Sequence, residues 1–270
     1  FQVQPLISKA ILPWFGGTPG VWTTCMLFFQ LLLCGGYAYS HLLTARISGR
    51  WQAVLHVTLL VVSLASLNIV PSEAWKPIGA NSPIATITLL LLSTVGLPYF
   101  ILSTTGPLLL RWFSLIQPDA SPYRLYALSN VGSLLALLTY PVLFEPLMRL
   151  ATQESIWSAT FVLFAGLCAG CAVRLWRQPT ENDPHAEETR HASITVQPGT
   201  IRLYVIWFLL AKVASMMLLA ETNEVCQDVA VIPFLWVIPL SLYLLSFILC
   251  FESDRWYRRS WYAIGTAILV

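Results

Sequence analysis

Residues 83–103, PIATITLLLLSTVGLPYFILS, decide the fold class. This stretch has no charged side chain, and as a helix rising about 1.5 Å per residue it reaches about 31 Å, the thickness of a bilayer's hydrocarbon core. It lacks the strict polar–apolar alternation of a half-buried strand. An open sheet in lipid would also leave backbone groups without hydrogen bonds. The stretch therefore predicts a membrane-spanning helix.

Comparable apolar runs recur along the rest of the chain, which is 57% hydrophobic and only 10% charged. So few charged residues cannot cover a water-facing surface, which excludes a soluble globular domain. The composition predicts an all-α integral membrane protein, a polytopic helix bundle. The other expected spans are residues 20–43, 51–70, 125–144, 155–173, 203–220 and 229–251, with partial helices at 1–13 and 261–270 because both ends look truncated.

One stretch interrupts this succession of spans. Residues 178–200, QPTENDPHAEETRHASITVQPGT, combine prolines and acids without an apolar period, which indicates a flexible linker. Six spans followed by such a loop is the layout of a major-facilitator bundle. The expected organisation is a first six-helix half at 1–177, a cytoplasmic linker at 178–200 and the start of a second half at 201–270.

The basic residues predict the orientation of the spans. Eleven arginines fall in alternate loops on one side, against Lys9, Lys76 and Arg149 on the other, and Lys212 lies inside a span. Arginine-rich loops, and residues 178–200 with them, are expected in the cytoplasm. The net charge of +2 leaves no basic field for nucleic acid. The arginine-rich set is Arg46, Arg50, Arg111, Arg124, Arg174, Arg177, Arg190, Arg202, Arg255, Arg258 and Arg259.

Three strings carry a family resemblance. They are QPLISKAILPWFGGTPGVWTTCMLFFQ at 4–30, PYRLYALSNVGSLLALLTYPVLFEP at 122–146 and PFLWVIPLSLYLLSFIL at 233–249. In this order and spacing they resemble the membrane region of the bacterial fused major-facilitator/spermidine-synthase-like family. The resemblance implies a facilitator-like bundle in the bacterial inner membrane. Many family members continue into a cytoplasmic aminopropyltransferase-like domain, and its Gly-rich motif is absent from this chain.

The resemblance also bears on transport. The facilitator signature after the second span is echoed by Arg46, Gly49 and Arg50, but Ala45 stands where an Asp is expected. That acid normally helps to latch the two halves, so its absence weighs against a conventional transport cycle.

Lys212 is the most exceptional single residue, because it lies near the middle of an expected span. A charge there costs roughly 2.5 to 3.5 kcal/mol on insertion scales, so it should face protein or water and have a partner. It either serves as a counter-ion for an anionic ligand or in a proton-coupled step, or is a structurally paired or snorkelling lysine.

Two similar strings offer a second candidate site. Gln4 and Lys9 flank Pro5 in the first span, and Glu145 and Arg149 flank Pro146 in the fifth. Prolines free backbone carbonyls, so these polar residues are candidates to line a cavity that opens outward. The alternative is helix termination with interfacial anchoring.

Acids and cysteines are further candidate ligand sets. Glu221, Glu224 and Asp228 fall in an expected outer loop, where they either attract a cation or are simply solvated. Cys168 and Cys171 form C-x-x-C inside a span, where close packing is favoured over redox or metal chemistry. The sequence predicts no metal site and no cofactor.

Small residues indicate helix-packing faces, and tryptophans indicate the membrane interface. Tryptophans near span ends, Trp51, Trp112 and Trp176 among them, are typical of the interfacial belt. The expected packing residues are Ser129, Asn130, Gly132, Ser133, Gly166 and Gly170.

Two functions remain at this stage. One is a non-catalytic membrane module that anchors, assembles or scaffolds its own missing cytoplasmic domain or other membrane subunits. The other is a major-facilitator-type transporter of a polyamine or organic anion. No nucleophile with a base is apparent, so an enzyme within the helices is not expected.

Overall fold

The computed structural model describes residues 2–16, 19–67, 69–72, 75–76, 83–117, 122–177, 198–228, 237–252, 260 and 264–265. These residues form helices and connecting turns, and none of them is in a strand. The chain divides into two compact units, residues Phe1–Arg177 and Gln178–Val270. Each unit is described by itself.

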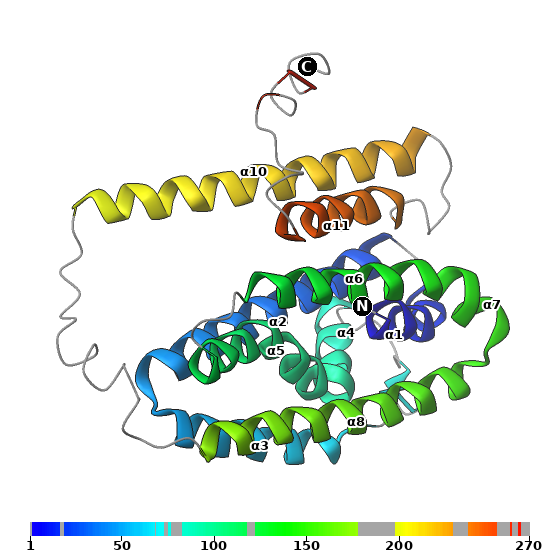
Figure 1. The fold of residues 1–270 in the computed structure, drawn as a ribbon. Helices are drawn as coiled ribbons and strands as arrows, with labels where there is room; N and C mark the ends of the chain where they lie inside the picture. Colours follow the sequence, from blue (N-terminus) through cyan, green and yellow to red (C-terminus); the bar gives the residue numbers. More distant parts are fainter. Residues whose placement is uncertain are drawn as a thin grey trace. The chain divides into compact units, whose positions relative to one another are not determined.

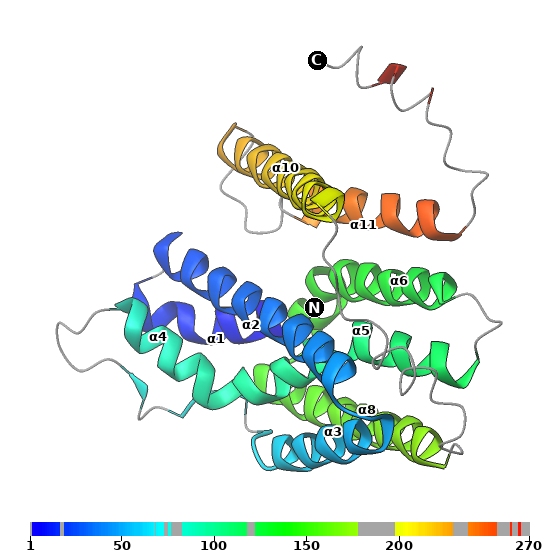
Figure 2. The same cartoon turned by 90° about the vertical axis from the view of Figure 1, so that its left-hand side faces the viewer.

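The first unit is a succession of helices with two π-helical turns (Figure 1). In Figures 1 and 2 α3 and α8 lie side by side, and α2 crosses α5. The elements are α1 (Val3–Ile11), the 3₁₀ turn η1 (Leu12–Phe15), α2 (Pro19–Arg46), α3 (Gly49–Leu64), α4 (Pro83–Leu91), the π turn η3 (Leu92–Gly96), α5 (Leu97–Ile116), α6 (Tyr123–Thr139), the π turn η4 (Tyr140–Phe144), α7 (Glu145–Leu147) and α8 (Leu150–Trp176). The second unit contains α10 (Pro198–Asp228) and α11 (Val237–Glu252).

The prediction of an all-helical, polytopic membrane protein is confirmed for the described residues. Five helices are long and apolar enough to cross a membrane: Thr23–Arg46, Pro83–Ile116, Arg124–Leu147, Leu150–Trp176 and Ile201–Ala220. Gly49–Leu64 and Val237–Phe251 are shorter apolar helices. The predicted span at 229–251 begins with eight residues that lie outside the described part, as do residues 178–197 of the predicted linker.

Two predicted helix ends are wrong. The span expected at 51–70 ends as α3 at Leu64, where the hydroxyls of Ser63 and Ser66 donate to nearby backbone carbonyls and compete with the helical ladder. The span predicted at 83–103 does not end at Ser103, because α5 continues through Pro107 to Ile116. A proline inside a packed membrane helix loses one backbone bond but is tolerated when neighbouring helices hold it in place.

Both π turns lie beside prolines. The turn η3 directly precedes Leu97 and Pro98, and η4 contains Pro141. Proline donates no backbone hydrogen bond, so the helical ladder is broken at each of these points. A π turn lets the helix continue with a shifted register, which leaves η4 widened where it meets α1 and α8.

The interior of the first unit is apolar and well filled. One cluster joins α1, α2 and α4 around Ile7, Phe29 and Leu90. In a second, Trp112 packs among side chains of α2, α3 and α8. A third lies between α3, α5 and α8 and comprises Leu60, Ile101, Phe161, Ala165 and Cys168.

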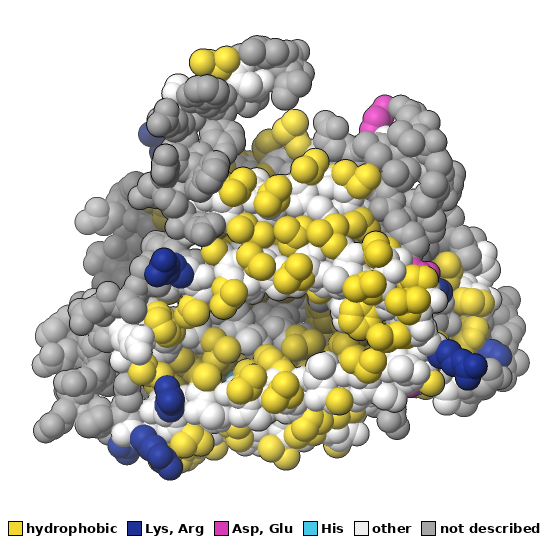
Figure 3. Space-filling view, turned by 45° about the vertical axis from the view of Figure 1, so that its right-hand side comes forward, with side chains coloured by type: hydrophobic (Ala, Val, Ile, Leu, Met, Phe, Trp, Pro, Cys, Tyr) yellow, Lys and Arg dark blue, Asp and Glu magenta, His cyan; other side chains and the backbone are white. Residues whose placement is uncertain are grey.

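The basic residues of the first unit separate to its two ends. Gln52 bonds Trp112 and Gly49 lies close to Leu175, so the beginning of α3 meets the ends of α5 and α8. Figure 3 shows an exposed face rich in hydrophobic side chains, with Lys and Arg at its edges. The end where α3 begins is rich in arginine, and the opposite end carries Lys9, Lys76 and Arg149. The arginines at the end where α3 begins are Arg46, Arg50, Arg111, Arg124, Arg174 and Arg177.

Candidate functional site

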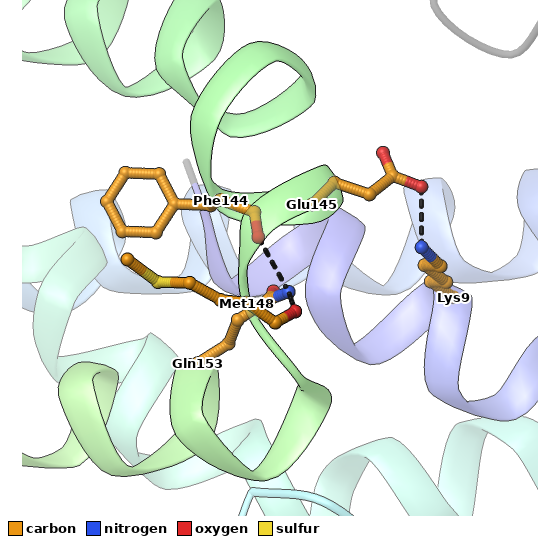
Figure 4. A network of polar contacts seen from close by, with 5 residues as sticks. All are labelled: Lys9, Phe144, Glu145, Met148 and Gln153. Carbon is orange, nitrogen blue, oxygen red and sulfur yellow. Dashed lines mark hydrogen bonds and ion pairs between the residues drawn. The ribbon is translucent and has the colours of Figure 1, made fainter.

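The polar site of the first unit lies where α1 meets α7. Lys9 Nζ on α1 forms an ion pair with Glu145 Oε1 on α7, at 2.5 Å (Figure 4). The two side chains are 53% and 21% exposed. The structure therefore brings together two of the four residues proposed from the Gln4/Lys9 and Glu145/Arg149 strings.

Gln153 organises the turn between α7 and α8. Its Nε2 donates to the carbonyl oxygens of Phe144 at 3.1 Å and Met148 at 3.0 Å (Figure 4). Met148 has extended backbone angles and ends α7, and Arg149 occupies the N-cap position of α8 without a side-chain cap bond. Gln153 thus satisfies the Met148 carbonyl at the end of α7 and gives a second donor to the Phe144 carbonyl, which also accepts from the Met148 N–H.

A small cavity opens beside this turn, between α1, η4 and α8. Its volume is about 110 Å³. Two of its lining residues, Tyr140 and Gln153, are only 4% and 7% exposed, whereas Ile156 and Thr160 are exposed at its mouth. The lining residues are Gln2, Leu6, Tyr140, Phe144, Gln153, Ile156, Trp157 and Thr160.

Several buried polar atoms around the cavity have no hydrogen-bond partner among the described residues. They include the Tyr140 hydroxyl, Gln153 Oε1 and the second carboxylate oxygen of Glu145, Oε2. A buried acceptor without a donor costs about 1–3 kcal/mol, so such atoms are rare unless something binds them. The site therefore contains several hydrogen-bond acceptors that receive no hydrogen bond from the described residues.

A second buried polar cluster lies at the arginine-rich end. Trp112 Nε1 donates to Gln52 Oε1 at 3.0 Å, and Gln52 Nε2 donates to the Ile47 carbonyl at 2.7 Å. His56 packs edge-on to Trp112, with ring centroids 5.8 Å apart, and Tyr39 lies near His56. No sequence pattern points to this cluster, because its members come from three helices and match no motif.

Within the first unit, Gln4 and Arg149 form no bond with the ion pair among the described residues. Gln4 is half-buried on α1, and Arg149 is exposed. Lys212 is exposed on α10 in the second unit, so its burial and pairing stay predictions. Residues 221–228 were expected in a loop, which is wrong: α10 runs through to Asp228. That segment has no Gly or Pro to end the helix, and the side chain of Glu224 is exposed.

The predicted packing glycines lie on open helix faces. A Cβ added at Gly132, Gly166 or Gly170 would meet nothing within 4 Å, and Ser129 is exposed. Asn130 and Ser133 are half-buried, and Asn130 Nδ2 donates to the Tyr126 carbonyl of its own helix. Within the first unit these residues do not make the close packing expected of them.

The close packing instead occurs between α2 and α5. A Cβ at Gly36 would lie 1.9 Å from Ser103 Oγ, so only glycine fits there. Ser40 Oγ shares its proton between the Gly36 carbonyl of its own helix at 2.9 Å and the Thr104 carbonyl across the crossing at 3.1 Å. Ser103 Oγ donates to the Phe100 carbonyl of its own helix at 2.6 Å and lies 3.2 Å from the Leu32 carbonyl across the crossing. Gly35-Gly36 in an apolar run is the signal that points to this crossing.

Neither the cysteines nor the acids assemble a metal site in the part of the chain that is described. Cys168 is buried and Cys171 exposed, both as free thiols, and no group of three His, Cys, Asp or Glu residues converges there.

No protein-family model, curated protein or solved structure matches the chain. The function is therefore argued from the residues and their geometry.

Proposed function

We propose that the chain is a non-catalytic membrane module that serves as an anchor, assembly or scaffold subunit in a larger membrane complex. The observation that carries this proposal is the set of open glycine faces. Gly166 and Gly170 lie on the side of α8 opposite its buried Ala165 and Cys168, and Gly132 is exposed on α6. Glycines on an exposed membrane-helix face allow another helix to approach closely.

The packed interior supports the same proposal. A transporter of this type needs polar groups near the middle of its bundle. Between α3, α5 and α8 that level is occupied by the apolar cluster around Leu60, Ile101 and Phe161. The ion pair Lys9–Glu145 lies instead at one end of the unit.

The proposed architecture is major-facilitator-like and resembles the membrane region of the spermidine-synthase-like family. Residues 1–177 form the first half, 178–200 a cytoplasmic linker and 201–270 the start of the second half. The unit boundary at Arg177–Gln178 supports this division. Any aminopropyltransferase-like domain would lie outside the chain.

The proposed location is the bacterial cytoplasmic membrane, with the arginine-rich end in the cytoplasm. Six arginines at one end of the first unit against Lys9, Lys76 and Arg149 at the other support this orientation.

The alternative is a transporter of a polyamine or an organic anion. The cavity beside the Lys9–Glu145 pair favours it, because it opens to the outside of the unit at the end proposed to face outward. Lys212 would then serve the second half as a counter-ion.

An assembly assay distinguishes the two functions. The full-length protein, extracted from native membranes in mild detergent, should migrate well above the mass of its own chain. The double substitution Gly166→Leu, Gly170→Leu should return it toward that mass, whereas Ala38→Leu on an exposed position of α2 should not. A protein that sediments as a lone chain, and whose saturable uptake of spermidine or organic anions is abolished by Lys212→Met, would show transport instead.

A further inference from the structure

The cavity between α1, η4 and α8 offers hydrogen-bond acceptors in a fixed geometry. Both N–H groups of the Gln153 amide point toward backbone carbonyls, of Phe144 and Met148, so the opposite atom, Oε1, can only accept. This oxygen is buried and has no donor among the described residues. Rotating the amide would break both bonds, so the acceptor is held in place.

Two further unused oxygens belong to Tyr140, which begins η4, and to Glu145, which follows η4 and does not line the cavity. Tyr140 lines the cavity, and its buried hydroxyl has no partner in the described part of the chain. Glu145 follows one π turn later, since its backbone N–H bonds the Tyr140 carbonyl. Lys9 occupies only Oε1 of Glu145 and leaves Oε2 without a donor. The unused groups are thus two oxygens that only accept and a hydroxyl that can accept.

The rest of the lining suits an alkyl group and a positive charge. Tyr140, Phe144 and Trp157 contribute aromatic rings, whose faces carry partial negative charge. Leu6 and Ile156 contribute aliphatic surface. A volume of about 110 Å³ is several times the roughly 10–15 Å³ that a cavity needs to hold one water, so a short alkyl amine fits.

We propose that this cavity binds a small protonated primary amine, whose ammonium group donates to Gln153 Oε1 and the Tyr140 oxygen while its alkyl chain lies against Leu6 and Ile156. An ammonium group has three donors and no acceptor, which complements a site of unused acceptors. Lys9 is more than half exposed and already paired, so its charge is largely compensated. The site does not depend on the proposed assembly role.

The experiment uses the full chain in lipid nanodiscs with propylammonium as the probe and propanol as its neutral analogue. Ligand-observed saturation-transfer NMR should give a saturable signal for propylammonium, with propanol at least tenfold weaker. Tyr140→Phe keeps the ring and should weaken propylammonium binding about fivefold, the net effect of one hydrogen bond. Tyr39→Phe is the matched control, because its hydroxyl is also buried and unpartnered among the described residues but lies outside this cavity.

Three outcomes would overturn the proposal: no saturable propylammonium signal, equal binding of propanol, or equal losses in Tyr140→Phe and Tyr39→Phe. Thermal unfolding of each variant checks that it is folded. Should Tyr140→Phe not fold, Ile156→Ala at the exposed mouth removes aliphatic surface against which the alkyl chain is proposed to lie and should weaken binding at least twofold. Unchanged binding in that variant would then contradict the site.

Discussion

At the scale of single residues, Trp112 shows that position along the chain does not decide whether a tryptophan is buried or exposed. Trp51, Trp112 and Trp176 all lie near predicted span ends, and this position predicts the interfacial belt for all three. Trp51 and Trp176 are 67% and 49% exposed, but Trp112 is 1% exposed and bonds Gln52. The assignment of Trp112 is wrong, because its environment is set by a partner sixty residues away in the chain.

The candidate site was likewise only half predictable. Lys9 and Glu145 stand out as charges next to prolines in apolar segments, so the sequence singles them out. Gln153 and Tyr140 do not, because a glutamine at a helix start and a tyrosine in a span are both common. Their importance comes from the π turn and the cavity, which depend on how α1 and α8 pack.

The first prediction compares two polar contacts at this site. Gln153→Leu should lower the free energy of unfolding by about 1–3 kcal/mol, because it leaves a buried carbonyl without its donor. Glu145→Gln should cost about 1 kcal/mol or less, since the Lys9–Glu145 pair is partly exposed and such pairs contribute little. The measurement is SDS-induced unfolding in mixed micelles, followed by tryptophan fluorescence.

Gln30→Leu provides the control, because Gln30 is exposed on α2 and should lose nothing. A larger loss of unfolding free energy for Glu145→Gln than for Gln153→Leu would contradict the prediction, because the ion pair would then contribute more to stability than the Gln153 hydrogen bonds.

At the scale of elements, apolar runs predicted the existence of the helices better than their ends. The run at 83–103 lies within one apolar helix, Pro83–Ile116, as expected. Yet α5 passes through Pro107 and α3 stops at Leu64. Hydropathy measures how a segment partitions into lipid, whereas helix ends depend on local hydrogen bonds and on neighbouring helices.

Gly36 tests the crossing of α2 and α5. Gly36→Ala should destabilise the protein by about 1–3 kcal/mol, the usual cost of overpacking, because the new Cβ would lie 3.1 Å from the Ser103 carbonyl carbon as well as against its hydroxyl. Gly35→Ala should be neutral or slightly stabilising, because its Cβ would meet only Phe100 Cε2 at 3.7 Å and alanine favours the helix.

Thermal unfolding in detergent would compare these adjacent variants. Equal stability of Gly36→Ala and Gly35→Ala would mean that the two helices do not approach as closely as described.

At the scale of the whole molecule, the charge pattern is the feature that the sequence and the structure share most directly. Positively charged side chains are costly inside a bilayer, so they collect at the ends of membrane helices whatever the packing between them. Which helices become neighbours was not predictable in the same way. The α2–α5 and α3–α8 pairs depend on side-chain shape. Hydropathy does not describe side-chain shape, so it cannot predict these pairs.

The orientation can be tested with two exposed serines at opposite ends of the first unit. Ser48 precedes α3 at the arginine-rich end, and Ser72 follows α3 at the end of Lys9 and Lys76. In a variant whose six native cysteines are replaced, Ser72→Cys should react with a membrane-impermeant maleimide added outside intact spheroplasts. Ser48→Cys should react only after the membrane is opened, because arginine-rich loops remain on the cytoplasmic side. Labelling of Ser48→Cys from outside, with Ser72→Cys protected, would invert the orientation and make the Lys9–Glu145 cavity face the cytoplasm.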